Sequence, residues 1–233
     1  MFDTQFNLYG FFILFSLVLY FMSACIISRK YKITLLDFMF SILYEFMFII
    51  IGALSLTYFS ELAKGHNGVI GLSSSGGAIG ALIGAFFYYI IYKKNLNNFL
   101  TIYILPLPLA YGISKIGCYL VGCCYGIYYS CIGSTSYNYS LSAPNNISLF
   151  PVQLLEVFLN IFIFLYLMLN FYKGKNQSWL IANCFIITGL CKFLTDFLRF
   201  SHNNIFLSLN QYICLFFIIL GIIIHIYAKK KRQ

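Results

Sequence analysis

The sequence carries little charge for its length. Only 9% of its 233 residues are Asp, Glu, Lys or Arg, and only six of them are acidic. A soluble globular domain usually has about 25% charged residues, so too few are present here to cover a surface that faces water. The composition therefore excludes an ordinary soluble enzyme. A mean hydropathy of +0.85 points to a membrane protein instead.

The cysteines lack the spacing of a structural zinc site. Eight are present, but no Cys-x-x-Cys pair occurs with a supporting histidine. We therefore predict no metal site and no cofactor. A disulfide between Cys131 and either Cys123 or Cys124 stays open, as does the role of a small apolar residue in a closely packed helix end. A cysteine nucleophile would need a base, and residues 117–126 contain no histidine.

Long apolar runs dominate the chain instead. A transmembrane helix takes about 20 apolar residues, and seven runs are long enough. In lipid the backbone amides have to be satisfied within their own segment, so the runs are predicted to be helices. The predicted fold class is an all-α polytopic membrane protein that forms one transmembrane domain, residues 1–233. The spans are expected at residues 8–28, 35–59, 68–92, 98–120, 150–171, 179–199 and 206–228.

Basic residues cluster after every second span. Eleven of the fifteen Lys and Arg residues fall on one side of a seven-span arrangement: Arg29, Lys30, Lys32, Lys93, Lys94, Lys173, Lys175, Lys229, Lys230, Lys231 and Arg232. The positive-inside rule makes that side cytoplasmic, which predicts an N-terminus outside and a C-terminus in the cytoplasm. The uncharged connection at 121–149 then becomes an extracytoplasmic loop. Because the net charge of +9 follows membrane topology, we predict no nucleic-acid partner.

Three further basic residues lie inside or at the end of apolar runs, namely Lys115, Lys192 and Arg199. A charge in that position costs at least a few kcal/mol and usually faces a partner or water. Lys192, Asp196 and Arg199 stand at i, i+4 and i+7, so they share one helix face. Asp196 offsets one of the two cations. The stripe is either a polar contact that joins helices or part of a site for an anion.

The predicted topology places most intramembrane polar residues at one depth, in the outer half of the membrane. Glycine repeats such as Gly76, Gly80 and Gly84 let helices approach one another closely near that level. A random scatter of packing residues would not produce one layer. The residues of this layer are Tyr9, Ser75, Gly76, Gly77, Lys115, Gln153, Glu156, Lys192, Asp196, Arg199 and Gln211.

Several segments resemble one enzyme family, the prolipoprotein diacylglyceryl transferases. Lys-Ile-Gly-Cys-Tyr-Leu-Val-Gly-Cys-Cys-Tyr-Gly at 115–126 is similar to the signature of that family, in a variant that ends in Cys-Cys-Tyr-Gly. The other similar segments follow in the order of the family: Leu8-Tyr9-Gly10, Ser75-Gly76-Gly77-Ala78-Ile79-Gly80, Phe150-Pro151-Val152-Gln153-Leu154-Leu155-Glu156, residues 192–199 and Ser208-Leu209-Asn210-Gln211. Together they cover nearly the whole chain.

The resemblance implies a reaction and its partners. Such enzymes take phosphatidylglycerol from the outer leaflet of the bacterial inner membrane, move its diacylglyceryl group to the lipobox cysteine of a preprolipoprotein, and release glycerol phosphate. Breaking a carbon–oxygen bond to a phosphodiester calls for cations on the leaving phosphate. The catalytic residues implied are Lys115, Lys192, Arg199, Tyr9 and Ser75. The substrate-binding residues implied are Gly76, Gly77, Gly117, Cys118, Gly126, Gln153, Glu156, Asp196 and Gln211.

The sequence departs from the family pattern at several of these positions. Ser75 stands where the family has histidine, and Lys115 and Lys192 stand where it has arginine. Cys118 replaces asparagine and Asp196 replaces glutamate. Lysine keeps the charge but cannot form the bidentate hydrogen bonds that a guanidinium group makes with phosphate. Three alternatives stay open: a lipid transferase with another thiol or peptide as acceptor, a lipid-binding protein without activity, and a transporter.

Overall fold

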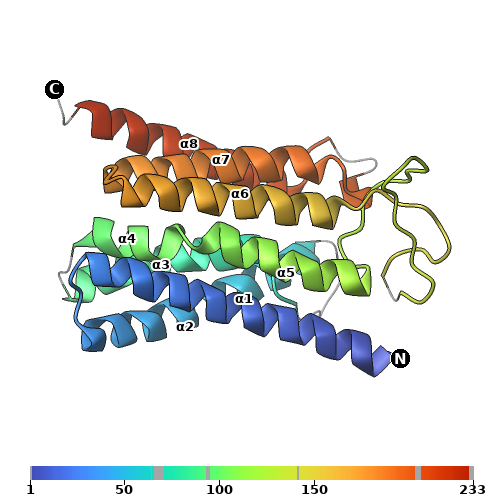
Figure 1. Cartoon of the computed structure of the whole chain (residues 1–233), viewed down its shortest axis with the longest axis horizontal. Helices are drawn as coiled ribbons and strands as arrows, with labels where there is room; N and C mark the ends of the chain where they lie inside the picture. Colours follow the sequence, from blue (N-terminus) through green and yellow to red (C-terminus); the bar gives the residue numbers. More distant parts are fainter. Residues whose placement is uncertain are drawn as a thin grey trace. The chain divides into compact units, whose positions relative to one another are not determined.

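The computed structural model in Figure 1 describes residues 2–63, 65, 71–92, 95–140, 142–202 and 206–230. Within these residues the chain is helical, apart from its connections and four isolated β-bridges. The helices are α1 (Phe2–Lys30), α2 (Leu35–Ala63), α3 (Ser74–Tyr92), α4 (Leu96–Ile104), α5 (Leu107–Val121), α6 (Val152–Tyr172), α7 (Gln177–Asp196), the short 3₁₀ helix η1 (Phe200–His202) and α8 (Leu209–Lys230).

Seven helical segments of the described chain are long and apolar enough to cross a membrane, with α4 and α5 counted as one span from Leu96 to Val121. This confirms the predicted all-α polytopic fold. The predicted start of the third span at 68–70 lies outside the described residues, as do four of the clustered basic residues, Lys93, Lys94, Lys231 and Arg232. The side of the membrane on which each terminus and the 121–149 loop lie stays a prediction.

Helix α6 shows how the sequence sorts its two faces. Phe158, Phe162, Leu165 and Leu169 recur at helical spacing and are exposed, as a lipid-facing stripe requires. The opposite face is buried and includes polar side chains, among them Glu156. The helix therefore turns apolar residues outward and polar residues inward, the reverse of a helix at the surface of a soluble protein.

Prolines divide the fourth span into two helices. Helix α4 ends at Ile104 and α5 begins at Leu107, with Pro106 between them and Pro108 in the first turn of α5. Proline has no backbone N–H group and clashes with the preceding turn, but it is tolerated at the start of a helix. The two prolines therefore account for the break within this span.

The chain forms two compact units, one made of Met1–Tyr20 with Pro108–Gln233 and the other of Phe21–Leu107. In the second unit, α3 packs closely along α2 through glycines. A Cβ added at Gly80 would come within 3.1 Å of the Ile49 Cα atom, and one added at Gly84 within 3.1 Å of the Phe48 Cβ atom. The glycine repeat of this span therefore serves close helix packing.

In the first unit, α7 packs against both α6 and α8 (Figure 1). Glycines again allow the approach, since a Cβ added at Gly189 would lie 3.1 Å from the carbonyl oxygen of Cys214 on α8. The irregular connection between α5 and α6 extends beyond the ends of these two helices in Figure 1. The first unit holds all the residues discussed next, except where another location is stated.

Candidate functional site

The carboxylate of Glu156 is the centre of a buried polar cluster. It lies in the first turns of α6, and the residue is 1% exposed. Its Oε2 atom is 3.2 Å from the Lys115 Nζ atom, and its Oε1 atom is 2.6 Å from the Arg199 Nη2 atom. Charges buried to this degree need close partners, and one carboxylate here serves two cations. We call Lys115, Glu156, Lys192, Arg199 and Tyr111 the Glu156 cluster.

Tyr111 joins the basic side chains of this cluster. Its hydroxyl donates a hydrogen bond of 3.0 Å to the Glu156 Oε1 atom and accepts one of 3.2 Å from the Arg199 Nη2 atom. The Nζ atoms of Lys115 and Lys192 lie 5.0 and 4.7 Å from the centre of its ring. Both distances are within the range of cation–π attraction. The aromatic ring thus holds two ammonium groups near each other without neutralising either one.

Arg199 also connects the cluster to the residues that follow α7. Its Nη1 atom lies 3.7 Å from the Asp196 Oδ1 atom. The other oxygen of Asp196 accepts a short hydrogen bond from the hydroxyl of Ser208. Gln211 accepts a bond of 2.9 Å from the Ser208 amide and donates one of 3.3 Å to the carbonyl of Phe193. Asp196 and Gln211 therefore hold the end of α7 against the start of α8.

Two properties of Arg199 matter for binding an anion. Its Nη2 atom lies 2.6 Å from the Glu156 carboxylate, and this pairing favours the charged form of the side chain. The guanidinium group therefore stays charged. Its Nε atom is buried and has no hydrogen-bond partner among the described residues. A buried donor without an acceptor is costly, so this atom favours an anionic ligand.

The loop between α5 and α6 is attached to the main chain of Arg199. Gly126 and Arg199 form an antiparallel bridge. The amide of Ile127 donates to the carbonyl of Leu198 at 3.0 Å, and the amide of Phe200 donates to the carbonyl of Tyr125 at 3.2 Å. A Cβ added at Gly126 would lie 3.0 Å from the Leu198 carbonyl oxygen, so the close approach depends on glycine.

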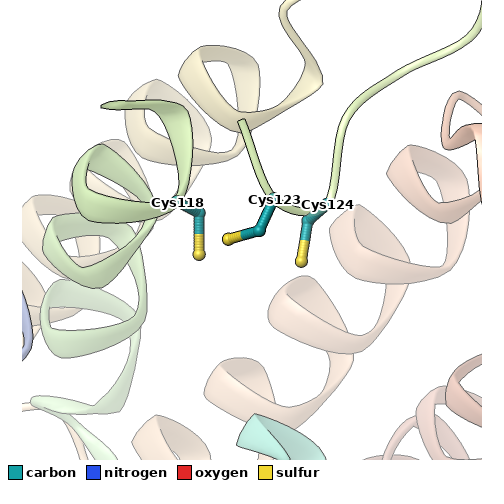
Figure 2. Close-up of side chains that lie close together, drawn as sticks. All are labelled: Cys118, Cys123 and Cys124. Atoms are coloured by element: carbon teal, nitrogen blue, oxygen red, sulfur yellow. The ribbon is translucent and has the colours of Figure 1, made fainter. Parts of the chain in front are cut away.

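Three of the eight cysteines come together where α5 ends. Cys118, Cys123 and Cys124 place their Sγ atoms within 4.8 Å of one another. In Figure 2 the Cys123 side chain points toward Cys118, and all three sulfur atoms lie on the same side of the turn. The eight cysteines are all free thiols, and Cys131 is exposed and not part of this group. We call these three residues the three-cysteine cluster.

The family is decided by comparison with known proteins. The family model of prolipoprotein diacylglyceryl transferase matches residues 1–227. The chain belongs to this family.

Several relatives named phosphatidylglycerol–prolipoprotein diacylglyceryl transferase are similar to the chain. The one from Clostridium tetani (strain Massachusetts / E88) is 30% identical over 160 residues, which are 66% of this chain and 64% of the relative. The one from Clostridium perfringens (strain 13 / Type A), numbered 2, is 28% identical over 68% of this chain and 62% of its own length. The one from Chlorobaculum tepidum is 27% identical over 78% of this chain and 64% of its own. The chain thus spans less than two thirds of the length of these relatives.

As a member of the transferase family, the chain is a multi-pass membrane protein. The structure brings together five of the residues predicted from the resemblance, namely Lys115, Glu156, Lys192, Asp196 and Arg199. Gln153 lies one turn before Glu156 and donates a hydrogen bond of 2.9 Å to the carbonyl of Cys123. It therefore holds the turn that carries the cysteines.

Tyr9 and Gly117 belong to a contact between α1 and α5 in the same unit. A Cβ added at Gly117 would lie 3.3 Å from both the ring and the carbonyl oxygen of Tyr9, and 3.2 Å from the Cβ atom of Phe12. The side chain of Tyr9 lies near Lys115 and the three-cysteine cluster. Gly117 thus brings α1 close to the helix that carries Lys115.

Ser75, Gly76 and Gly77 lie in the second unit, at the start of α3, and all three are buried. The amide of Gly77 donates to the carbonyl of Ser73 at 2.9 Å. The roles assigned to these residues in catalysis and substrate binding stay predictions.

Tyr111, which joins the two lysines of this transferase-family site, was not predicted from the sequence motifs. Tyr111 lies four residues before Lys115, and residues at i and i+4 face the same side of a helix. Thr195 was also missed, although its hydroxyl lies 3.4 Å from the Glu156 Oε1 atom. It stands one residue before Asp196. Both residues could have been found by following the helix faces of the buried charges.

Proposed function

We propose that the protein transfers the diacylglyceryl group of phosphatidylglycerol to the thiol of a lipobox cysteine in a prolipoprotein, in the inner membrane of a bacterium. The observation that carries the proposal is the Glu156 cluster within a member of this family. Three basic side chains and a tyrosine meet around one buried carboxylate. With Asp196 included, the group has three positive and two negative charges, which favours an anion.

The proposed reaction exchanges one bond at carbon for another. The sulfur of the acceptor thiol attacks the glyceryl carbon that carries the phosphate, a carbon–sulfur bond forms, and the carbon–oxygen bond to phosphate breaks. Glycerol phosphate leaves with the electron pair of that bond, and the proton of the thiol passes to water. Charge therefore grows on the leaving phosphate in the transition state, where fixed cations act most strongly.

The distances support a separate role for each basic side chain of the cluster. Arg199 offers a guanidinium group with an unpaired buried Nε atom, which suits a phosphate oxygen. The ammonium groups of Lys115 and Lys192, both over the ring of Tyr111, add positive charge beside it. Glu156 keeps two of the cations in place before the lipid binds, so their orientation costs little during the reaction.

The decisive experiment measures transfer of labelled diacylglycerol from phosphatidylglycerol to a lipobox peptide by the purified protein. We expect the wild-type chain to label a peptide with cysteine and not one with serine. Arg199→Ala is expected to reduce transfer at least 100-fold, as removal of one fixed donor to a developing charge commonly does. Arg29→Ala is the matched control, because Arg29 is exposed at the end of α1.

A second arm tests the chain in cells. A bacterium depleted of its own transferase should grow when this gene is expressed, and should fail with the Arg199→Ala variant at equal protein level. Transfer that is unchanged in both Arg199→Ala and Lys115→Ala would refute the assignment of the cluster to phosphate. Absence of labelled peptide with folded wild-type protein, together with a new lipid adduct on another thiol, would replace the acceptor proposed here.

A further inference from the structure

The three-cysteine cluster is created by a specific helix ending. At the end of α5, the amide of Cys123 donates to the carbonyl of Cys118 at 3.0 Å, and the amide of Gly122 donates to the carbonyl of Tyr119 at 3.3 Å. Gly122 has a φ of +76°. These are the two bonds and the left-handed glycine of a Schellman motif, which reverses the chain direction. Residues five apart in sequence are thereby placed next to each other.

A second left-handed residue completes the cluster. Cys124 has a φ of +54°, which a residue other than glycine rarely adopts. The hydrogen bond from Gln153 to the carbonyl of Cys123 holds the turn from the side of α6. The consequence is visible in Figure 2, where the Cys124 sulfur lies on the same side of the turn as the other two. The local backbone is thus held in the form that collects the three thiols.

The separations suit one metal ion better than a disulfide. Zinc binds thiolate sulfur at about 2.3 Å, and tetrahedral geometry then sets the ligand sulfurs about 3.8 Å apart. Sulfurs already within 4.8 Å reach that arrangement by small side-chain rotations. A disulfide needs about 2.05 Å and uses only two thiols. Cys123 and Cys124 are adjacent, so their Cα atoms are about 3.8 Å apart, below the usual disulfide range.

The charge around the cluster also favours a thiolate site. Three thiolates with one divalent cation carry a net charge of −1. Lys115 and Arg199 are close enough to Cys124 to interact with it electrostatically. The Glu156 cluster together with Asp196 carries a net charge of +1, so the two groups are complementary. Cys118 is buried, Cys123 is half-buried and Cys124 is exposed. The side of the cluster at Cys124 is therefore accessible to a further ligand.

We propose that Cys118, Cys123 and Cys124 bind one Zn²⁺ ion through three thiolates, and that the fourth coordination position takes the acceptor thiol of the transfer reaction. The second half of this inference rests on the function proposed above. Catalytic zinc sites keep such a position for water or substrate, and a thiol that binds zinc loses its proton. That proton passes to water on the exposed side of Cys124.

The bound thiolate then carries out the proposed transfer. Its sulfur forms the bond to the glyceryl carbon as the carbon–oxygen bond to phosphate breaks. The product sulfur is a neutral thioether, a weaker ligand for zinc than a thiolate, so the lipidated peptide leaves the metal. This site was not expected from the sequence, because a spacing of five residues followed by one is not a zinc pattern.

The test uses the full chain, purified in detergent and reduced without chelator. Zinc content is measured by elemental mass spectrometry, and Co²⁺ replaces zinc for absorption spectroscopy. We expect about one metal ion per chain and a sulfur-to-cobalt band. Cys123→Ser should weaken metal binding at least tenfold. Cys131→Ser is the matched control, a free cysteine of the same loop outside the cluster, and should bind metal as the wild type does.

The substrate half is tested by adding a lipobox peptide to the cobalt-loaded protein. A peptide with cysteine should strengthen the sulfur-to-cobalt band, and the same peptide with serine should not. An unchanged band with both peptides would overturn the assignment of the fourth position. Metal titration of the wild-type chain needs no variant, so the test stands even if Cys123→Ser does not fold.

The remaining outcomes separate the two proposals. Lipid transfer by protein that holds no metal, at a rate that a chelator leaves unchanged, would refute the zinc site and keep the proposed function. A bound metal with no transfer to any lipobox peptide would keep the zinc site and refute the function. A reduced wild-type chain that binds neither Zn²⁺ nor Co²⁺, or equal loss of metal in Cys131→Ser, would also refute the site.

Discussion

Replacing Glu156 by Gln tests the centre of the buried cluster. Breaking a buried ion pair by removing one partner costs about 3–5 kcal/mol, because the other charge stays buried without compensation. Gln keeps an oxygen that can accept from Arg199 and Tyr111, so their contacts are largely retained. Its amide group, however, would face the Lys115 ammonium 3.2 Å away. We therefore expect a loss at the lower end, about 3 kcal/mol in the free energy of unfolding.

A double-mutant cycle isolates the contact with Lys115. In Lys115→Met/Glu156→Gln the unpaired ammonium is gone, and we expect the double variant to be more stable than Glu156→Gln alone, with a coupling of about 1–3 kcal/mol between the two sites. Unfolding of the detergent-solubilised protein by SDS, followed by circular dichroism, gives the four free energies. Lys173→Gln, at an exposed position just after α6, serves as a control that should stay within about 0.5 kcal/mol of the wild type. Equal stability of Glu156→Gln and wild type, with no coupling to Lys115, would refute the description of this carboxylate as the partner of two cations.

Three further changes have definite expected results. Tyr111→Phe keeps the ring that the lysines face but removes the hydroxyl, and should lower the rate of lipid transfer about tenfold, whereas Tyr111→Leu should lower it further. Labelled-peptide assays compare the two variants, and equal rates would contradict a role for the ring. Gly117→Val should lower the free energy of unfolding by about 1–3 kcal/mol, because the valine side chain would clash with α1. Gly10→Ala is the control, because a Cβ atom at Gly10 has open space, and it should be neutral or slightly stabilising. Similar unfolding free energies for both variants would contradict the close contact between Gly117 and α1. Gly122→Ala places an alanine in the left-handed conformation, so we expect the free energy of unfolding to fall by about 1 kcal/mol and cobalt binding to weaken. Unchanged cobalt binding would show that the turn does not bring the three thiols together.

The fold could be predicted from the sequence because bilayers restrict the solutions so strongly. Apolar run lengths indicated seven helical spans. The ends of the helices were harder to predict. The expected end of the sixth span at 199 lies three residues beyond the end of α7 at Asp196, because Arg199 pairs with the loop instead of continuing the helix.

The site was predictable only in part. Buried charges in apolar helices pointed to Lys115, Lys192 and Arg199, since such charges need partners. The pairing of Glu156 with Lys115 and Arg199 was not predicted, because pairing between helices depends on rotations that helix periodicity does not fix. The assignment of Glu156 to substrate binding stays a prediction. The three-cysteine cluster was missed for a related reason. Spacing along the chain gives no sign of a reversal that depends on one left-handed glycine.

The pairing of Gly126 with Arg199 has a mechanical consequence for the whole loop. Because Ile127 and Phe200 add a main-chain hydrogen bond on either side, the segment cannot swing aside as a free flap. Lifting it would break those bonds, at a cost of about 1 kcal/mol each. If Arg199 binds the lipid phosphate as proposed, a ligand that contacts the loop would change the affinity for that phosphate, and by reciprocity bound phosphate would stiffen the loop.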